Sequence, residues 1–370
     1  MASAAFPREA YYERIGATKT LLPLVTANAS PTPGALGVDF LRNLMLAHLS
    51  AIPFENVDAV LGRPISTHLS HICDKLIYAK RGGYCVEHNS LLRAVMVDAG
   101  FTHIRTLGAR PVIFDESAPT GRVHVMNLVT IHGDQPERWL VDVGTSAGVP
   151  MAPIRLDTTE SQFTPAGEFR VQKYDLCTNT EMMSYARPLG GFDEGWTEYS
   201  FEMHAHSGNW RAIHRFDLQP QFPRNVFAFN YVNYRVGSIG YSLRGSRTVT
   251  AWAPEGTQGI PNGVDGVLCV PRGVYGLLVD TTSRVSARTL NAYPGVPDVA
   301  PPTGDLAPLV PREEHPTTPS ELYDWMIEYL GLDFAQTRLP QYSVTREDFV
   351  KALEARVVRF GGKPWEAPVY

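Results

Sequence analysis

The sequence predicts an α+β protein with a helical N-terminal part and a middle part that is an antiparallel sheet or barrel. Apolar residues recur at helical spacing through the first hundred residues, and from Phe101 they recur at every second residue, as in strands. The chain has 370 residues, of which 44% are hydrophobic and 19% charged, which is typical of a globular protein with two or three domains.

The N-terminal helices are predicted by apolar stripes and by residues that end helices. Residues 38–50 form an amphipathic pattern that stops before Pro53. A further helix is expected over about residues 84–99, because its apolar stripe is followed by Gly100, which suits a C-terminal cap.

Strand patterns fill the middle of the chain. Residues 122–131 and 138–143 alternate around the turn H-G-D-Q-P-E and predict a hairpin, and short strand-like segments continue to about Phe216. A third region, about residues 221–290, also carries strand-like stretches.

The C-terminal part begins with an irregular segment and ends in helices. Residues 294–319 contain 8 prolines, too many for a helix or a central strand, so we expect a surface excursion. Thr318 and Glu321 form a capping box with Pro319 at the first helical position, and a last helix is expected near residues 345–360.

Charge and cysteine content exclude several classes of protein. A net charge of −5 argues against binding to nucleic acid or to an anionic membrane. Four cysteines are too few for a disulfide framework, which favours a reducing compartment. The N-terminus lacks the apolar core of a signal peptide, and no apolar run approaches 18 residues, so we expect a cytoplasmic protein without a membrane span.

Cys85 is the first candidate for chemistry. It follows Gly82 and Gly83 at the expected start of a helix, where unpaired N–H groups and the helix dipole favour a thiolate over a thiol. The two glycines are expected to let the chain turn sharply and to leave the sulfur uncovered. The alternative is that Cys85 is a small buried core residue. A neighbouring base, held by a group that orients it, would identify Cys85 as a nucleophile instead.

His124 and Asp142 are the candidates for that base and that orienting group. His124 shares a strand face with apolar residues, so a core histidine is the alternative, but Asp142 lies inside an apolar strand and needs a donor. An ideal ladder places His124 opposite residue 144, and we expect a bulge to bring it to Asp142. The three residues would then form a Cys-His-Asp triad.

Several motifs together resemble one family. The segment R-G-G-Y-C-V-E-H-N at residues 81–89 is similar to the RGGxCxExN signature of the arylamine N-acetyltransferases. The order Cys, His, Asp also fits that family, and the similarity covers about residues 6–285. Further matching segments are Y-Y-E-R-I-G (11–16), P-F-E-N (53–56), T-G-R-V-H (120–124), V-D-V-G (141–144), F-D-L-Q-P (216–220) and G-V-Y-G-L-L-V (273–279).

The resemblance implies an architecture and a reaction. Residues 1–100 would be a helical bundle carrying the nucleophile, residues 101–220 a β-barrel carrying His and Asp, and residues 221–370 an α/β lid with the Pro-rich insertion. The site would be a cysteine-protease-like triad. The reaction would be a ping-pong transfer from acetyl-CoA, a co-substrate, to an aromatic amine or hydrazine, with no permanently bound cofactor, in a monomer or weak oligomer.

The resemblance also assigns residues. Cys85 would take the acetyl group, His124 would move the protons and Asp142 would orient His124, while Glu55 and Arg81 would form a structural ion pair. The residues implied for the CoA or substrate channel are Thr120, Gly121, Val123 and Ser238. Thr145 stands where the family usually has an aromatic residue against the acceptor ring, so the acceptor stays open, as does a malonyl-CoA or propionyl-CoA donor.

Four rival interpretations remain. G-T-S-A-G at residues 144–148 matches a hydrolase elbow with Ser146 as nucleophile, but that motif requires a helix directly afterwards, and Pro150 and Pro153 argue against one. The histidine-containing clusters are incomplete as zinc sites, so no metal is expected. They are His68, His71 and Cys73, and His204 with His206. The other two interpretations are a Cys-His-Asp hydrolase of thioesters or amides and an inactive CoA-binding protein.

Overall fold

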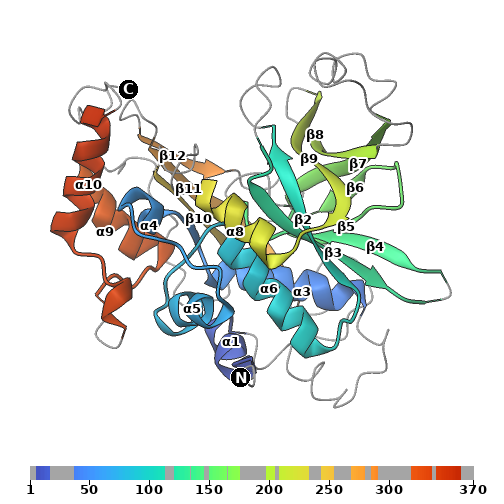
Figure 1. The fold of residues 1–370 in the computed structure, drawn as a ribbon, viewed down its shortest axis with the longest axis horizontal. Coiled ribbons are helices and arrows are strands. Elements are labelled where there is room, and N and C mark those ends of the chain that lie inside the picture. Colours follow the sequence, from blue (N-terminus) through green and yellow to red (C-terminus); the bar gives the residue numbers. More distant parts are fainter. Residues whose placement is uncertain are drawn as a thin grey trace.

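The computed structural model of the chain describes residues 6–16, 37–112, 121–133, 135–145, 150–164, 166–175, 197–204, 208–232, 243–253, 268–279, 285–290, 318–335 and 339–359 (Figure 1).

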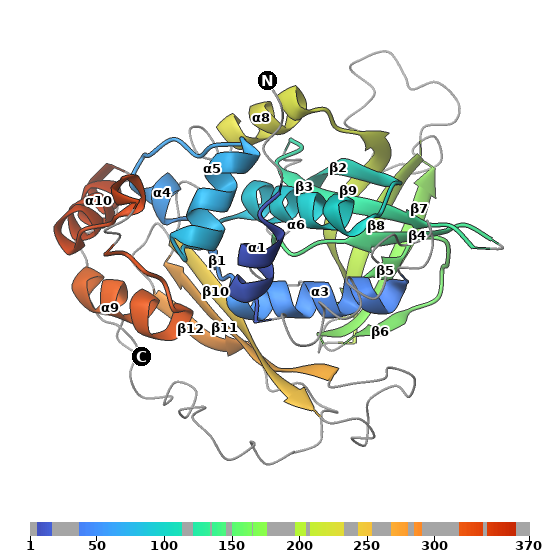
Figure 2. The ribbon, with the colours of Figure 1, turned by 90° about the horizontal axis from the view of Figure 1, so that it is seen from below.

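The first hundred residues are helical, as the sequence predicts. Buried side chains of α1, α3 and α6 pack into one hydrophobic core, and Figure 2 shows α1 and α3 beside α6. The elements are α1 (Arg8–Arg14), α3 (Val38–Ala51), α4 (Val57–Val60), α5 (Leu69–Cys73), the π-helical segment Asp74–Tyr78 and α6 (Cys85–Ala99).

The ends of α6 agree with the sequence prediction. Its first residue is Cys85, and the backbone N–H of Tyr84 donates to Glu87 Oε2 at 3.1 Å, which satisfies one of the donors at the helix start. At the other end Gly100 has φ 108°, the left-handed conformation that glycine adopts at low cost.

A buried chain of hydrogen bonds ties α6 to its neighbours. The Tyr11 hydroxyl lies 2.8 Å from His48 Nδ1, and His48 Nε2 lies 2.8 Å from His88 Nδ1. His88 Nε2 lies 3.1 Å from the carbonyl oxygen of Pro53, which can only accept, so every proton in the chain points from Tyr11 toward Pro53. These hydrogen bonds therefore join α1, through α3 and α6, to the residue directly before β1.

The glycine pair in front of Cys85 is required for a different reason than predicted. Neither Gly82 nor Gly83 has a positive φ, and Lys80 takes the left-handed conformation in this turn instead, with φ 49°. A Cβ on Gly82 would collide with the Pro53 carbonyl oxygen, and one on Gly83 would lie 2.7 Å from Glu87 Oε2. Close packing against neighbouring groups therefore demands glycine here.

The middle of the chain forms one eight-stranded antiparallel sheet, which confirms the predicted sheet or barrel. Its strand order is β5-β4-β3-β2-β9-β8-β7-β6. The strands are β2 (Ile104–Pro111), β3 (His124–Ile131), β4 (Glu137–Val141), β5 (Ile154–Arg155), β6 (Gln162–Thr164), β7 (Gly167–Asp175), β8 (Thr197–His204) and β9 (Trp210–Pro220).

A side chain links the two edge strands of this sheet. The Gln162 amide on β6 donates to the carbonyl oxygen of Arg155 at 2.9 Å and accepts the Arg155 backbone N–H at 2.7 Å on β5. The sheet encloses its own apolar core, built from residues such as Leu128 and Phe216. The eight strands therefore make a nearly closed barrel, seen as the green and yellow strands of Figure 1.

A second sheet joins segments from distant parts of the sequence. Its order is β1-β10-β11-β12, and β1, which lies between α3 and α4, pairs with β10. These strands are β1 (Phe54–Glu55), β10 (Leu243–Ala253), β11 (Leu268–Val279) and β12 (Val285–Leu290). Helix α8 (Pro223–Tyr231) follows the barrel. The predicted domain boundaries at residues 100 and 220, and the lid, stay predictions.

The C-terminal helices begin as the sequence predicts. Helix α9 (Pro319–Leu330) has Thr318 as its N-cap, and the Thr318 hydroxyl accepts the Glu321 backbone N–H at 3.2 Å. Apolar side chains of α9 and α10 (Arg346–Arg359) pack against α4, which precedes Cys85 in the chain. Among the helices that the structure describes, none is long and apolar enough to cross a membrane.

Candidate active site

Cys85 lies at the first position of α6, as predicted, but its side chain is covered. Only 2% of the residue is exposed, so the expectation of an uncovered sulfur is wrong. Its Sγ lies 3.8 Å from the carbonyl oxygen of Val123, the residue before β3. Gly144 closes the other side, because a Cβ there would lie 2.5 Å from the Cys85 Cα. The N-terminus of α6 is thus enclosed by the two segments that carry His124 and Asp142.

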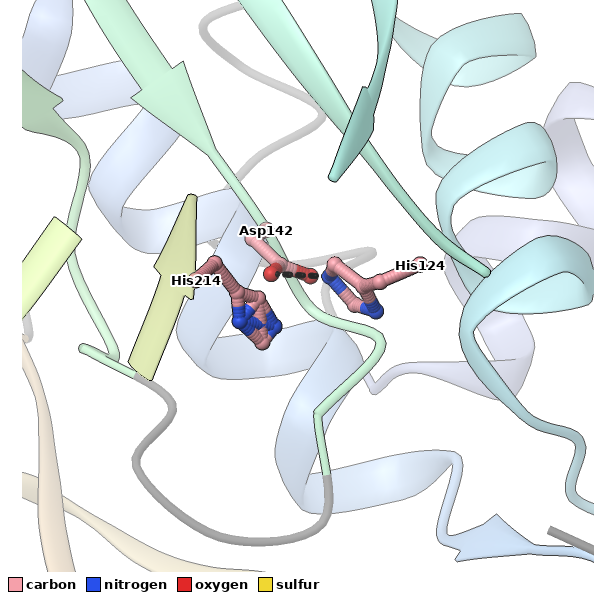
Figure 3. A group of neighbouring side chains, drawn as sticks. All are labelled: His124, Asp142 and His214. Carbon is pink, nitrogen blue, oxygen red and sulfur yellow. Dashed lines mark hydrogen bonds and ion pairs between the residues drawn. The ribbon is translucent and has the colours of Figure 1, made fainter. Parts of the chain in front are cut away.

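His124 and Asp142 are hydrogen-bonded to each other, with 2.7 Å between His124 Nε2 and Asp142 Oδ2 (Figure 3). His124 begins β3 and Asp142 follows β4, and the last paired residues between these strands are Asn127 and Val141. This register places His124 and Asp142 diagonally on one face, within reach of long side chains. The predicted bulge is absent from the described residues of this strand pair.

The Asp142 carboxylate accepts four hydrogen bonds. Oδ1 accepts from Asn89 Nδ2 and from the Gly144 backbone N–H, each at 2.8 Å, and Oδ2 accepts from His124 and from Thr145 Oγ1 at 3.1 Å. Burial alone would raise the pKa of Asp142, but the charge and hydrogen bond of His124 hold this pKa well below its usual range. Asp142 is therefore a buried anion with all its acceptor sites used.

His124 is held in its protonated form. Burial alone would lower the pKa of His124, but the Asp142 carboxylate and the neighbouring Cys85 sulfur raise this pKa to about 10. Because Nε2 is committed to Asp142, Nδ1 is the nitrogen left for the sulfur. At neutral pH the site thus holds an imidazolium between the Asp142 carboxylate and the cysteine.

Asn89 is a structural part of the site that the sequence reasoning did not assign. It lies one helical turn after Cys85, and Nδ2 donates to the Val125 carbonyl oxygen at 2.6 Å as well as to Asp142. Its Oδ1 accepts the Val143 backbone N–H at 3.2 Å. Asn89 therefore ties α6 to both β3 and the segment after β4. Its place in the RGGxCxExN signature was the available signal.

His214 is the second residue that sequence reasoning missed. It comes from β9, and its ring lies 4.1 Å from the His124 ring, centroid to centroid, at an interplanar angle of 88° (Figure 3). It is 2% exposed, and neither ring nitrogen has a hydrogen-bond partner among the described residues. Burial and the nearby His124 charge lower the pKa of His214 to about 3, so it is neutral. No local pattern distinguishes His214 from other strand residues.

A buried network of charges supports the loop before Cys85. Arg81 Nη2 donates to Glu55 Oε1 at 2.7 Å, which confirms the predicted ion pair, and Arg81 Nη1 donates to the Tyr342 carbonyl oxygen at 2.8 Å. Lys75 Nζ lies 2.9 Å from Glu87 Oε1 in the same network. Burial raises the pKa of Glu87 to about 7. These residues connect the first turn of α6 to the C-terminal segment.

The residues implied for the CoA channel are placed only in part. Gly121 is exposed, and a Cβ on it would meet no described atom within 4 Å, while Val123 is half-buried beside Cys85. Thr120 and Ser238 lie outside the described residues. Of these four positions, the described structure therefore places Val123 beside the sulfur and Gly121 two residues before it, at the surface.

The hydrolase elbow is not favoured by the part of the chain that can be described. Ser146 lies outside the described residues, but residues 150–153 contain no helix and β5 begins at Ile154. The sharp strand-to-helix turn of that motif is therefore missing over those residues.

The two predicted histidine clusters do not assemble a metal-ligand set where the structure describes them. His71 Nδ1 lies 2.9 Å from Ser66 Oγ, and His204 lies 3.2 Å from Glu168, while His206 is outside the described residues. Within the described part of the chain, one group has ligand atoms that all lie within 4.8 Å of one another: His124, Asp142 and His214.

Comparison with known proteins identifies the family. A family model described as N-acetyltransferase matches residues 37–225, about half of the chain. The arylamine N-acetyltransferase / N-hydroxyarylamine O-acetyltransferase of Salmonella typhimurium is 39% identical over 140 residues, covering 38% of this chain and 48% of that protein. The Escherichia coli arylamine N-acetyltransferase is 34% identical over 187 residues, covering 50% and 57%. The chain spans about half the length of these curated relatives.

Solved structures show the same fold. The S. typhimurium arylamine N-acetyltransferase superposes with a TM-score of 0.60 at 23% identity, covering 94% of this chain and 97% of that one. The Mycobacterium marinum arylamine N-acetyltransferase in complex with CoA has a TM-score of 0.60 at 19% identity, covering 94% and 98%. The chain belongs to the N-acetyltransferase family, and its predicted resemblance to the arylamine N-acetyltransferases is confirmed.

Proposed function

We propose that the chain is an acyltransferase that moves an acetyl group from acetyl-CoA to the amine of an arylamine or arylhydrazine through a thioester on Cys85. One observation carries the proposal. The cysteine at the N-terminus of α6 adjoins His124, whose pKa is raised to about 10 by Asp142 and by the sulfur itself. The family supplies the substrate class, since its curated relatives are named arylamine N-acetyltransferases.

The first half-reaction forms the acyl-enzyme. The Cys85 thiolate attacks the thioester carbonyl carbon, a new carbon–sulfur bond forms, and the bond to CoA breaks. The imidazolium of His124 gives its Nδ1 proton to the departing CoA thiolate, which leaves as a thiol. Asp142 keeps Nε2 protonated throughout, so the ring stays in the tautomer whose Nδ1 can exchange a proton with the site.

The second half-reaction transfers the acetyl group to the acceptor. The amine nitrogen attacks the Cys85 thioester, its proton goes to the free Nδ1 of His124, and the thiolate leaves. The thiolate and imidazolium are then restored. A thioester is energised enough to acylate a weakly basic aromatic amine, which a free carboxylate is not. Attack by water instead of amine would make the same site a hydrolase.

The approach of CoA is proposed to run past Gly121 and Val123. Gly121 is exposed with open space around it, and the Val123 carbonyl lies against the sulfur, so this segment leads from the surface to Cys85. Thr120 and Ser238 remain part of the proposed CoA contacts. A malonyl or propionyl group on the same carrier is an alternative donor.

The acceptor side of the site is proposed to lack the aromatic contact that the family pattern implies. Thr145 replaces the usual aromatic residue, and its hydroxyl is engaged with Asp142 at 3.1 Å. Because the Thr145 hydroxyl donates to the Asp142 carboxylate, the methyl group of Thr145, rather than an aromatic ring, is left to contact the acceptor. We therefore expect a weaker dependence on ring stacking of the acceptor.

The test is a measurement of free CoA thiol after mixing the pure chain with acetyl-CoA, with and without aniline. A transferase releases CoA beyond one equivalent only when aniline is present. A hydrolase releases it continuously without aniline, and an inactive CoA-binding protein releases none. Repeating the assay with propionyl-CoA and malonyl-CoA ranks the donors, and the Cys85→Ser variant supplies the background rate.

A further inference from the structure

His214 is placed by an irregularity of the sheet. On β8 and β9 the pairing shifts, since Phe201 is opposite His214 whereas Glu202 is opposite Ala212, which leaves Ile213 as an extra residue. Bulges of this kind re-aim side chains and are common beside functional sites. The result is an imidazole turned onto the ring of His124, as Figure 3 shows.

The surroundings of His214 leave both ring nitrogens without a partner among the described residues. The residue is 2% exposed, and leaving a buried polar group without a hydrogen bond destabilises the fold. The proposed transfer reaction does not use His214, because His124 alone moves the protons. A buried, neutral imidazole with free nitrogens next to a carboxylate is instead a suitable metal ligand.

We propose that His124, Asp142 and His214 form a binding site for a divalent transition-metal ion, with Zn²⁺ as the best-suited ion, and that occupation of this site blocks the transfer reaction. The ligand atoms of the three residues all lie within 4.8 Å of one another and all three residues are buried. Two imidazoles and one carboxylate are a donor set that zinc binds, with a fourth position for water. This proposal differs from the sequence prediction, which expects no metal site in the chain.

The geometry needs a small adjustment to accept the ion. Zinc lies about 2 Å from nitrogen and oxygen ligands, which sets the ligand atoms about 3–4 Å apart. The pair of His124 Nε2 and Asp142 Oδ2, now at 2.7 Å, opens slightly, and the His214 ring moves toward it by about 1 Å. Asn89 and the Gly144 N–H already hold the other carboxylate oxygen, as outer partners of metal ligands do.

Binding exchanges a metal ion for a proton. The ion takes the place of the Nε2 proton of His124 on the Asp142 side, and that proton leaves to solvent. No oxidation or bond cleavage accompanies the exchange, so a chelator reverses it. With Nε2 bound to the ion, Nδ1 carries the only remaining proton of the His124 ring, and its loss would leave an imidazolate. The ring can therefore no longer give and take the Nδ1 proton that the proposed reaction requires.

Cys85 is the competing ligand, since thiolates also bind zinc. Because Nε2 of His124 is bonded to Asp142, Nδ1 is the nitrogen left for the sulfur, whereas the proposed ion sits on the Nε2 side with Asp142 and His214. The proposal therefore excludes a metal–sulfur bond. The two possibilities differ in spectrum and in the variant that removes binding.

The experiment titrates the chelator-treated chain with Co²⁺ as a spectroscopic probe and then with Zn²⁺ in competition. We expect one ion per chain, visible bands of nitrogen and oxygen ligation, and no thiolate charge-transfer band. Cys85→Ser should bind as the unaltered chain does. His214→Phe keeps a ring of similar size, and it should lose more than the roughly 10–100-fold in affinity that an outer partner costs. His71→Gln, in the histidine cluster seen in the sequence, should change nothing.

A second variant guards against misfolding. Asp142→Asn removes the carboxylate ligand and should also weaken binding, and thermal melting shows whether each variant is folded. Equal Co²⁺ affinity in folded His214→Phe, loss of binding in Cys85→Ser, or no binding by the unaltered chain would each overturn the site. Acylation measured with and without Zn²⁺ tests the inhibition, which rests on the proposed function, whereas the titration does not depend on activity.

Discussion

A single methyl group at residue 144 should separate the two halves of the site. A Cβ on Gly144 would lie 2.5 Å from Asn89 Nδ2, 2.5 Å from the Cys85 Cα and 3.0 Å from the Cys85 carbonyl oxygen. Ordinary contact begins at 3.4 Å, so Gly144→Ala must push the segment carrying Asp142 away from α6 by about 1 Å. Gly144 has no positive φ, so alanine itself suits the backbone and the collision is the only cost.

This displacement sets the expected magnitude. Overpacking costs about 1–3 kcal/mol of stability, and a 1 Å misplacement at a reacting site costs about 10²-fold in rate. Gly133→Ala is the matched control, because Gly133 lies in the turn of the same hairpin and its Cβ would meet one atom at 3.9 Å. The assay is single-turnover release of CoA, with the melting temperature of each variant. A folded Gly144→Ala variant that acylates at the normal rate would refute the close apposition of Cys85 and the Asp142 segment.

Three further predictions concern the charged groups. Asp142→Asn lets an amide present the wrong hydrogen-bonding group to His124, so we expect the rate of single-turnover acylation to fall about 10²–10³-fold. This loss is smaller than the roughly 10⁴-fold loss for the same change in serine enzymes. The melting temperature is measured in parallel, and a lowered melting temperature with normal acylation would contradict the orienting role of Asp142. The His124 ring should show no protonation step by NMR between about pH 6 and 9. Because the pKa of His124 is raised in the folded chain, the His124–Asp142 pair stabilises the fold fully below the unfolded pKa of about 6.5. That stabilisation is lost as the pH rises through about 10. A protonation step of His124 near pH 6.5 in the folded chain would refute this. Iodoacetamide should label Cys85 before Cys73, because burial raises the pKa of the Cys73 thiol to about 11. Acetyl-CoA should protect Cys85 from this labelling. Faster labelling of Cys73, mapped by mass spectrometry, would contradict the assignment of Cys85 as the nucleophile.

Local chemistry made the helix boundaries predictable. The start of α6 at Cys85, its end at Gly100 and the start of α9 at Thr318 depend on capping residues within a few positions, and all three agree with the structure. The hairpin was also predictable, because the alternation of residues around its turn sets the register. The pairing of His124 with Asp142 then followed, but a diagonal contact makes it rather than a bulge.

Contacts between distant segments were not predictable in the same way. β9 pairs with β2, about a hundred residues earlier, and an alternating pattern does not tell which strand lies beside which. His214 therefore gave no signal of its place beside His124. The glycines at 82 and 83 show the same limit, since their role depends on Pro53 and Glu87 packing against them and not on their own turn.

The most direct test of the central claim is the mass of the chain after mixing with acetyl-CoA in the absence of an acceptor. We predict one acetyl group per chain, located on Cys85 by peptide mapping, and its removal when an arylamine is added. Cys85→Ser should acquire none. Transfer to an arylamine without an acetylated Cys85, or with the acetyl group on another residue, would contradict the proposed thioester intermediate.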